Sequence, residues 1–304
     1  MEKTYIITGP TSGIGLRTAF ELAKLGTVVL VGRNPQKLHE VQKAIEKKGQ
    51  HAVSVVCDLS DLASVRQAAG RIVGLGLPIA GLVNNAGIMT LRPEKNGEGW
   101  DLSFATNHLG PFALTEALVP HLADGTNVLF LVSAVEDPER KPAVAVGLRG
   151  GRFLSIPASA RGEWKPGGSK TPGFDAYATT KQTILASAMA FARETPRLQF
   201  SALEPGLNPT TGLGGGEFGP VLRFVQAFLI PLLVPLFRPF VKILSTPKRA
   251  ARVITKILTD ESGQNGIYYD EKGEPMAGSP LVRDPQFQDR VVAETRAFLS
   301  GARS

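Results

Sequence analysis

The sequence predicts an α/β protein built on a doubly wound, mostly parallel sheet with helices on both faces. Short apolar runs rich in β-branched residues alternate with longer segments of helical spacing over the first two-thirds of the chain. The runs are apolar throughout, as expected of parallel strands that are buried on both faces. Signals that start and stop helices fall between them. Strand–helix alternation of this kind favours a parallel sheet joined by right-handed crossovers.

Six apolar runs are expected to form strands, and the segments between several of them show helical periodicity. The residues 14–25 and 62–73 carry apolar side chains at helical spacing. The expected strands are Tyr5–Thr8, Val28–Val31, Val53–Cys57, Ile79–Val83, Val128–Val132 and Phe200–Leu203.

Helix boundaries can be assigned at two further places. Asn34-Pro35 is typical of a cap followed by the first helical residue, and Gly49 is a stop signal. Asp284-Pro285 is expected to open a final helix that Gly301 closes. The sequence contains no internal repeat and no low-complexity linker, so residues 1–304 are expected to form a single domain.

The composition excludes several classes of protein. The chain is 43% apolar and 20% charged, with a net charge of +7 that is scattered along the sequence. No block of like charges indicates nucleic-acid binding. Cys57 is the sole cysteine, which excludes an internal disulfide, and the four histidines lack metal-ligand spacing, so no metal site is expected. No secretory signal is visible, and a cytoplasmic location is expected.

Two segments interrupt the alternation, namely 134–175 and 207–245. Both follow expected strands at the edge where open α/β sheets bind ligands. Within the second segment, 221–244 is strongly apolar, but its longest uncharged stretch has 14 residues, whereas a membrane span needs about 18. It is interpreted first as a substrate lid. A peripheral contact with a membrane and an oligomer interface are the alternatives.

A glycine-rich turn follows the first expected strand. Between Thr8 and Gly15 the glycines permit a tight turn, and the helix that follows presents free N–H groups and the positive end of its dipole to a phosphate. In a strand–turn–helix unit this pattern favours a dinucleotide. The expected cofactor-binding residues of this turn are Gly9, Thr11, Ser12, Gly13, Ile14 and Gly15.

The end of the second expected strand indicates which dinucleotide binds. NAD-binding sites usually place an acid there for the ribose hydroxyls. This chain has Gly32-Arg33 instead, and a guanidinium can pair with a 2′-phosphate, so NADP(H) is favoured over NAD(H). Arg17 is a weaker second candidate for that phosphate.

These features, taken with motifs further along, resemble the short-chain dehydrogenase/reductase family. The matching pieces run in the family's order from residue 4 to about 211: the Thr8–Gly15 turn, Asp58-Leu59, Asn84-Asn85-Ala86-Gly87, Asn107, Ser133, Tyr177-Ala178-Thr179-Thr180-Lys181 and Pro205-Gly206. The segments Gly99–Phe112, Ser245–Ala251 and Gly266–Tyr269 are similar to those of the retinol dehydrogenase-like subgroup. The resemblance implies a Rossmann-type domain with seven strands.

The chemistry of carbonyl reduction explains the expected catalytic set of Asn107, Ser133, Tyr177 and Lys181. A phenol has a pKa near about 10 and is a poor acid–base group near neutrality. Lys181 lies four residues after Tyr177, on the same helix face, and its ammonium is expected to lower that pKa. Tyr177 then exchanges the proton and Ser133 polarises the substrate oxygen. The resemblance implies that Lys181 also holds the nicotinamide ribose and that Asn107 supports a water relay.

The resemblance assigns the remaining matched residues to cofactor binding. Asp58 and Leu59 would form the adenine pocket. The small residues beside Asn85 would let the cofactor pass close to the backbone, and a turn after the sixth strand would close over the nicotinamide. These expected cofactor-binding residues are Arg33, Asp58, Leu59, Asn85, Ala86, Gly87, Tyr177, Lys181, Pro205, Gly206 and Thr210.

The sequence departs from the family at one point, because Ser133 and Tyr177 are 44 residues apart and many members have a shorter connection. The expected activity is NADP(H)-dependent interconversion of an alcohol and a ketone or aldehyde of retinoid, steroid or fatty type. A nucleotide-binding sensor without turnover and a reductase of C=C or C=N bonds are the alternatives. A homodimer or homotetramer is expected from family habit.

Overall fold

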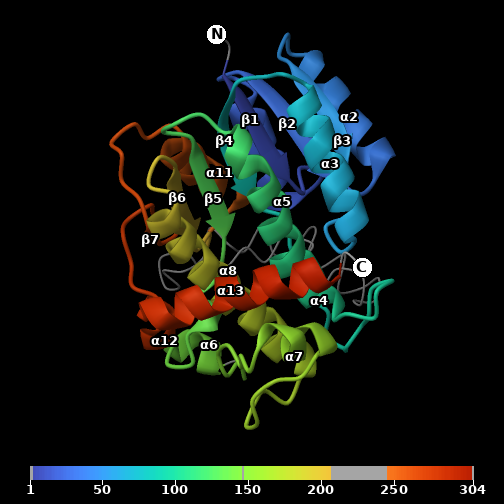
Figure 1. Ribbon diagram of the computed structural model, residues 1–304. Helices are drawn as coiled ribbons and strands as arrows, with labels where there is room; N and C mark the ends of the chain where they lie inside the picture. Colours follow the sequence, from blue (N-terminus) through green and yellow to red (C-terminus); the bar gives the residue numbers. More distant parts are fainter. Residues whose placement is uncertain (1–2, 146, 207–244, 303–304) are drawn as a thin grey trace, which may run out of the picture.

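A computed structural model describes residues 3–145, 147–206 and 245–302, and its centre is a seven-stranded sheet (Figure 1). The strand order is β3-β2-β1-β4-β5-β6-β7, and all neighbouring strands are parallel. This confirms the predicted fold class. The strands are β1 (Thr4–Thr8), β2 (Thr27–Gly32), β3 (Ala52–Val56), β4 (Ile79–Asn84), β5 (Asn127–Leu131), β6 (Gln199–Leu203) and β7 (Ile267–Tyr269).

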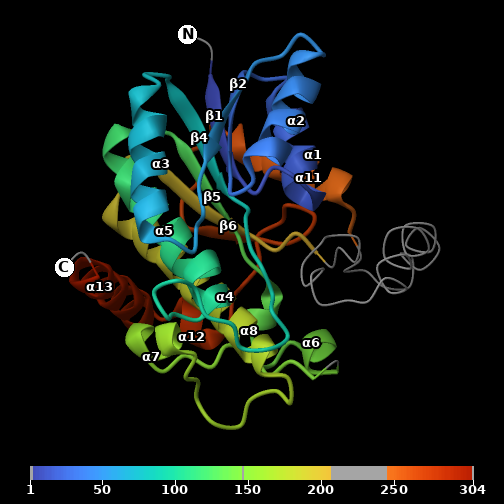
Figure 2. The same ribbon diagram turned by 90° about the vertical axis from the view of Figure 1, so that its right-hand side faces the viewer.

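Helices cover both faces of the sheet (Figure 2). On one face α1 (Gly13–Leu22) and α11 (Pro247–Leu258) pack together beside α2 (Pro35–Glu46). On the other face lie α3 (Leu62–Gly74), α5 (Gly110–Leu118) and α8 (Pro172–Glu194). Each face has its own cluster of buried apolar side chains. Because both faces are covered, the strands can be apolar throughout.

The remaining helices of the described chain include seven short ones and the long α13 (Pro285–Gly301). The short ones are α4 (Leu102–Phe104), the π-helix η1 (Ala105–Leu109), the 3-10 helices η2 (Val119–His121) and η3 (Ala134–Glu136), α6 (Lys141–Ala145), α7 (Ile156–Arg161) and α12 (Pro280–Arg283). The short strand β7 was implied only by family resemblance, because three apolar residues give no periodic signal.

The predicted helix boundaries are confirmed by their capping contacts. The Asn34 side chain accepts a hydrogen bond from the backbone N–H of Lys37 at 2.9 Å, directly before α2. Gly49 follows that helix with a positive φ of 73°, which suits glycine. Asp284 caps α13 by accepting from the N–H of Gln286 at 2.9 Å. Each cap satisfies a backbone N–H that has no partner inside its helix.

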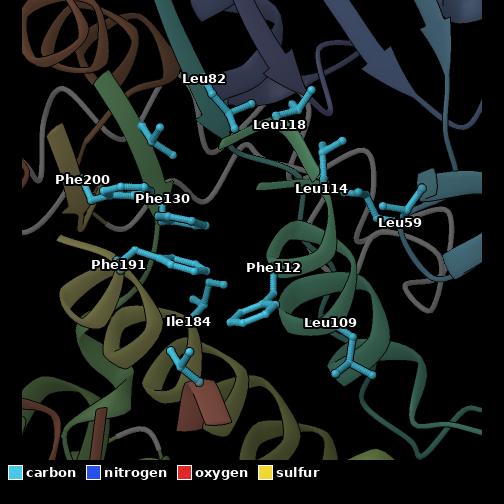
Figure 3. Close-up of a cluster of buried hydrophobic side chains, with 14 of the residues drawn as sticks. Leu59, Leu82, Leu109, Phe112, Leu114, Leu118, Phe130, Ile184, Phe191 and Phe200 are labelled. Carbon is cyan, nitrogen blue, oxygen red and sulfur yellow. The ribbon is translucent and has the colours of Figure 1, made fainter. Parts of the chain in front are cut away.

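A group of aromatic rings joins α8 to the sheet and to α5 (Figure 3). The Phe191 ring on α8 lies 5.0 Å from Phe112 on α5, 5.4 Å from Phe200 on β6 and 6.4 Å from Phe130 on β5, measured between centroids. All four side chains are buried. Stacked and tilted pairs of this kind add to the stabilisation from burying their area.

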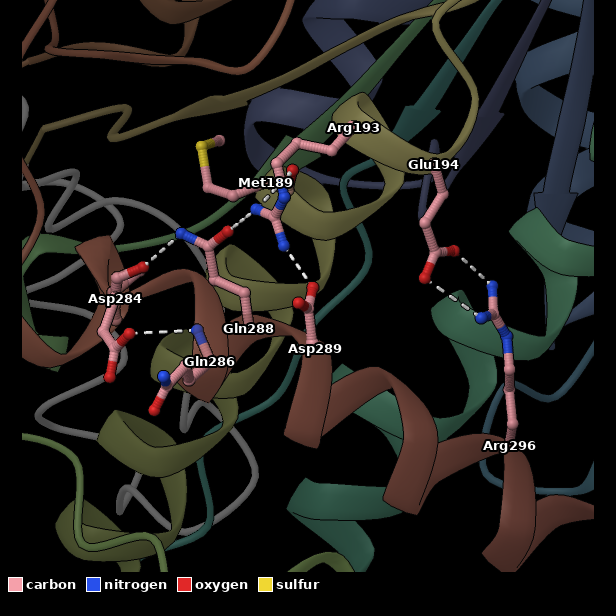
Figure 4. A network of polar contacts seen from close by, with 9 residues as sticks. Met189, Arg193, Glu194, Asp284, Gln286, Gln288, Asp289 and Arg296 are labelled. Carbon is pink, nitrogen blue, oxygen red and sulfur yellow. Dashed lines mark hydrogen bonds and ion pairs between the residues drawn. The ribbon is translucent and has the colours of Figure 1, made fainter.

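Helix α13 lies across α8 and carries a network of charged contacts (Figure 4). Arg193 of α8 donates to Gln288 and Asp289, and Arg296 donates to Glu194 at 2.6 Å. The side chains in these ion pairs are about one-third to two-thirds exposed, so each pair stabilises the fold only slightly. The buried apolar residues Val291, Val292 and Leu299 contribute most of the docking.

The region 134–175, which interrupts the alternation in the sequence, contains η3, α6 and α7, and its last four residues belong to α8. Trp164 packs against the core, with its ring 6.3 Å from that of Phe104. This contact anchors the segment to the core. The predicted lid at 207–245, with the apolar stretch 221–244 and Thr210, lies outside the described residues except for Ser245.

We expect Phe191→Ala to lower the free energy of unfolding by about 3–5 kcal/mol, because it leaves a cavity among three other rings. Urea unfolding followed by circular dichroism measures this. Leu25→Ala is the control, since Leu25 is 45% exposed. A loss of less than about 1 kcal/mol for Phe191→Ala would show that the cluster does not anchor α8.

Candidate active site

The turn between β1 and α1 depends on glycine for close backbone approach. Gly9 and Gly13 have positive φ angles of 66° and 54°. A Cβ atom on Gly15 would lie 2.1 Å from the carbonyl oxygen of Gly9 and 2.4 Å from Nδ2 of Asn85, which sterics forbid. The turn therefore brings the N-terminus of α1 to the carboxyl edge of the sheet, where its N–H groups can bind an anion.

Asn85 and Thr8 brace this turn against the end of β4. Nδ2 of Asn85 donates to the carbonyl oxygen of Thr8 at 2.8 Å and to that of Gly9 at 3.2 Å. The Thr8 hydroxyl accepts from the N–H groups of Asn85 and Ala86 at 3.0 and 2.9 Å. Asn85 was predicted to bind cofactor, and its contacts also give it a structural role. Thr8 was not predicted as a site residue.

A cavity of about 490 Å³ opens at this edge and contains most of the predicted cofactor-binding residues. Its size is within the usual range for small-molecule sites. The predicted residues that line it are Gly9, Thr11, Ser12, Gly13, Ile14, Gly15, Arg33, Asp58, Leu59, Asn85, Ala86, Gly87, Tyr177, Lys181 and Pro205. Asn107, Ser133 and Gly206 are near the site but do not line this cavity, and Thr210 lies outside the described residues. The glycine cradle and the helix N-terminus fit a dinucleotide.

One end of the cavity is positively charged. Arg33 is exposed there, and Lys37, in the first turn of α2, also lines the cavity. Arg17 does not line it, which disfavours the weaker candidate. Lys37 could have been found from the sequence, because it lies four residues after Arg33 and one helical turn past the Asn34 cap. Two cations at this end suit a phosphate group.

Helix α8 brings Tyr177 and Lys181 to the opposite end of the cavity. Nζ of Lys181 lies 5.4 Å from the centroid of the Tyr177 ring and donates to the carbonyl oxygen of Leu131 at 2.9 Å. The Lys181 side chain is only 5% exposed. The two residues lie on the same face of the helix, as their spacing predicted.

Asn107 supports the loop beside Lys181 from the π-helix η1. Its side chain accepts from the N–H of Ile88 at 2.8 Å and donates to the carbonyl oxygen of Ile88 at 2.7 Å. It also donates to the hydroxyl of Thr180 at 3.3 Å. These bonds hold the chain after β4 against α8, so that Asn107 and Lys181 lie close to Gly87.

Ser133 follows β5 at the N-cap position of η3, and its hydroxyl lowers the pKa values of both Tyr177 and Glu204. Sequence reasoning missed Glu204. This buried residue follows β6, and its carboxylate accepts from the N–H of Ala134 and from the N–H of Gly206 at 3.0 Å. The signal in the sequence was an acid at the end of an apolar strand, directly before Pro205-Gly206.

Burial governs the pKa values at this end of the cavity. The pKa of Tyr177 is raised, first by burial and then by the negative charge of Glu204, while the hydrogen bond from Ser133 opposes the shift. Burial lowers the pKa of Lys181 to about 8, against a smaller opposing effect of Glu204. The predicted lowering of the phenol pKa is therefore wrong in its net direction, because burial dominates.

Comparison with known proteins shows relatives of one kind. The family model described as short chain dehydrogenase matches residues 3–139. Human polyprenol dehydrogenase is 34% identical over 126 residues, which are 40% of this chain and 38% of that protein. Human retinol dehydrogenase 13 is 37% identical over 123 residues, covering 40% of this chain and 37% of that protein. The chain thus matches less than two-fifths of the length of these two relatives.

Other comparisons extend over most of the chain. Pea chloroplastic protochlorophyllide reductase is 27% identical, covering 87% of this chain and 68% of that protein. A crystal structure of a protein of uncharacterised role from Mycobacterium paratuberculosis has a TM-score of 0.70 at 23% identity and covers 98% of this chain and 93% of that one. A Burkholderia cenocepacia short-chain dehydrogenase in complex with NADP has a TM-score of 0.62 at 20% identity, covering 89% and 96% of the two chains.

Residues 3–139 thus resemble the short chain dehydrogenase family in sequence, and the fold is that of solved structures that include a short-chain dehydrogenase. Within the described part of the chain, no helix is long and apolar enough to cross a membrane. The same residues contain no cluster of three or more His, Cys, Asp or Glu that could hold a metal ion.

We expect Lys181→Met to stabilise the protein near pH 7 by up to about 3 kcal/mol, because burial lowers the lysine pKa from 10.5 to about 8. Between the native pKa of about 8 and the unfolded value of 10.5, the unfolded chain binds more protons than the native protein. The free energy of unfolding of the wild type therefore rises with pH in this range. The advantage of the methionine variant should therefore shrink from pH 8 to pH 10.

Urea unfolding at several pH values measures this difference in stability. The control is Lys256→Met, which removes an exposed lysine on α11 and should follow the pH dependence of the wild type. This expectation would be contradicted if Lys181→Met were less stable than wild type at pH 7 and if the difference were the same at every pH.

Proposed function

We propose that the protein interconverts an alcohol and a ketone or aldehyde by hydride transfer with NADP(H). The observation that carries this proposal is that Tyr177 and Lys181 line the same cavity as the glycine turn, with Ser133 beside Tyr177. A proton donor, a group that polarises oxygen and a dinucleotide cradle are the parts that carbonyl reduction requires.

The bound dinucleotide supplies or accepts the hydride. The N–H groups of the turn before α1 would bind its pyrophosphate, and Asp58 with Leu59 would hold its adenine. Lys181 would hold the ribose near the nicotinamide, with Asn107 ordering the loop beside it. Pro205 and Gly206 would border the nicotinamide. The family resemblance supports these assignments, and the cavity lining supports all of them except Gly206 and Asn107.

The protein's own residues would handle the proton. In reduction, the hydroxyl of Tyr177 donates its proton to the oxygen that becomes an alkoxide, while Ser133 donates a hydrogen bond to the same oxygen. In oxidation Tyr177 takes the proton back. The Lys181 ammonium stabilises the tyrosinate left after proton donation, by charge at short range.

The preference for NADP(H) rests on the positive end of the cavity, where Arg33 and Lys37 can pair with a 2′-phosphate. No acid follows β2, so the usual partner of the NAD ribose hydroxyls is missing from this position. The structural relative from Burkholderia cenocepacia, which was solved with NADP, supports the proposal.

The substrate class proposed is a lipophilic carbonyl compound or alcohol of retinoid, steroid or fatty type. Two relatives are named for polyprenol and retinol, and a third for protochlorophyllide. They also support the proposal of a retinol dehydrogenase-like subgroup. The proposed lid or membrane contact at 221–244, the homodimer or homotetramer and the cytoplasmic location belong to the same proposal.

We expect purified protein to oxidise NADPH with some members of a panel of lipophilic aldehydes and ketones. Tyr177→Phe should lower the rate by about a hundredfold or more, because the proton donor is lost, while NADPH binding measured by fluorescence stays intact. Undiminished turnover in Tyr177→Phe would show that Tyr177 is not the proton donor. Tight NADPH binding with no turnover of any member would favour the sensor, and turnover of only C=C or C=N substrates would favour the third alternative.

We expect Arg33→Asp to weaken NADPH binding by about tenfold or more relative to NADH, because one charge-assisted hydrogen bond to the phosphate is replaced by repulsion. Fluorescence titration with both cofactors measures the ratio of the two Kd values. The matched control is Arg17→Asp, an equal charge change on α1 outside the cavity. If both variants change the ratio equally, Arg33 has no specific part in selecting the cofactor.

A further inference from the structure

Helix α11 is amphipathic, and its inner side is fixed to the rest of the protein. It packs against α1, and Leu258 lies so close to β4 that a Cβ atom on Gly81 would meet its side chain at 2.2 Å. The buried residues of the inner side are Ala250, Ala251, Ile254, Ile257 and Leu258. The opposite side of the helix is therefore held toward solvent in a defined orientation.

The outer side of α11 carries four cations, and the helix contains no acid. Lys248, Arg252 and Lys256 are exposed and follow one another at intervals of four residues, so they form a stripe along the helix. Arg249 lies beside this stripe and is partly exposed. The ion pairs found among the described residues leave all four cations without an acidic partner.

The stability of α11 gives no reason for this arrangement. Like charges four residues apart repel one another, and Lys248, Arg252 and Lys256 make two such pairs. Lys248 and Arg249 also lie in the first turn, where the helix dipole disfavours cations and where no acid offsets them. A negatively charged partner outside the protein would relieve both kinds of repulsion.

The positive charge extends to the helices beside α11. Together α1, α2 and α11, on one side of the sheet, carry seven lysines or arginines and three acids (Figure 2). On the other side α3, α5, α8 and α13 carry six and five. There Arg290 of α13 pairs with Glu294 at 2.7 Å across one helical turn. The charge of the helices is thus concentrated on one side, as an electrostatic docking surface requires.

We propose that the outer side of α11 docks the protein on an anionic lipid bilayer. Clusters of four or more lysines and arginines on an amphipathic helix attract acidic lipid headgroups. A single-stranded nucleic acid fits this surface less well, because its bases need exposed aromatic rings on which to stack. The sole phenylalanine, tyrosine or tryptophan of α1, α2 and α11 is Phe20, which lies beneath Lys48, with Nζ 4.5 Å from the ring centroid.

This inference goes beyond the proposed function, because it concerns where the protein binds rather than the reaction. It depends on charge and needs no contribution from the apolar segment 221–244. It would bring the cavity to the phase in which a lipophilic substrate dissolves.

Co-sedimentation with vesicles tests the inference without any substrate. We expect wild type to bind vesicles that contain phosphatidylserine and not vesicles of phosphatidylcholine alone, and high salt should release it by screening the charges. Arg252→Glu/Lys256→Glu should weaken binding about thirtyfold or more, because each cation contributes about fivefold near an anionic surface.

The matched control is Arg66→Glu/Arg71→Glu, which makes an equal change in net charge at two exposed positions of α3 on the other side of the sheet. This variant should bind the vesicles nearly as wild type does. Circular dichroism shows whether each variant is folded, and all four substituted side chains are exposed, so both variants are expected to fold.

Three results would overturn the inference. They are the absence of binding by wild type to the anionic vesicles, equal losses in the two variants, and binding that high salt leaves unchanged, which would indicate an apolar contact instead. Tighter binding of wild type to single-stranded or duplex DNA than to these vesicles, lost in the α11 variant alone, would assign the surface to a nucleic acid and also overturn the inference.

Failure of this inference is distinguishable from failure of the proposed function. Salt-sensitive vesicle binding that the α11 variant loses, with no turnover of any panel member, would keep the docking surface and overturn the proposed reaction. Turnover by a wild type that does not bind anionic vesicles would do the reverse. Where both hold, the α11 variant should reduce a lipophilic substrate in anionic vesicles more slowly than wild type and a water-soluble one equally fast.

Discussion

The close approach of the glycine turn to the end of β4 is the constraint on which the rest of the site depends. A side chain on Gly15 would collide with the carbonyl oxygen of Gly9, so the turn and α1 can meet the sheet only where glycine stands. Thr8 and Asn85 then join the turn to β4 through four hydrogen bonds. This contact fixes the ends of β1 and β4 relative to one another. Residues that are distant in the sequence can therefore line the cavity in a defined geometry.

The two halves of helix α8 have different roles. Its first half places Tyr177 and Lys181 in the cavity, and burying the lysine there costs stability because its ammonium has left water. Its second half carries Phe191, whose ring contacts aromatic residues of α5, β5 and β6. The apolar contacts at one end of the helix offset the polar burial at the other, as is common at sites where function opposes stability.

The sequence predicted the features that depend on local pattern. Continuous apolar runs located six strands, and capping residues such as Asn34 and Asp284 located helix ends. The features that escaped prediction depend on three-dimensional neighbours. β7 is too short to show a period. The Glu204 side chain reaches the N–H of Ala134 because β5 and β6 pair side by side, and this pairing cannot be seen in the sequence. The pKa of Tyr177 was predicted in the wrong direction, since burial cannot be read from the spacing of Tyr177 and Lys181 alone.

The structure of the β5–β6 edge shows why residue 204 carries a hydrogen-bond acceptor. An apolar side chain there would deprive the N–H of Ala134 of its acceptor, at a cost of about 1–3 kcal/mol for a buried donor. Any acceptor would meet that structural need, and a glutamine has one. What a carboxyl group adds is a second protonation state at the end of β6. The backbone therefore explains why an acceptor is needed at this position.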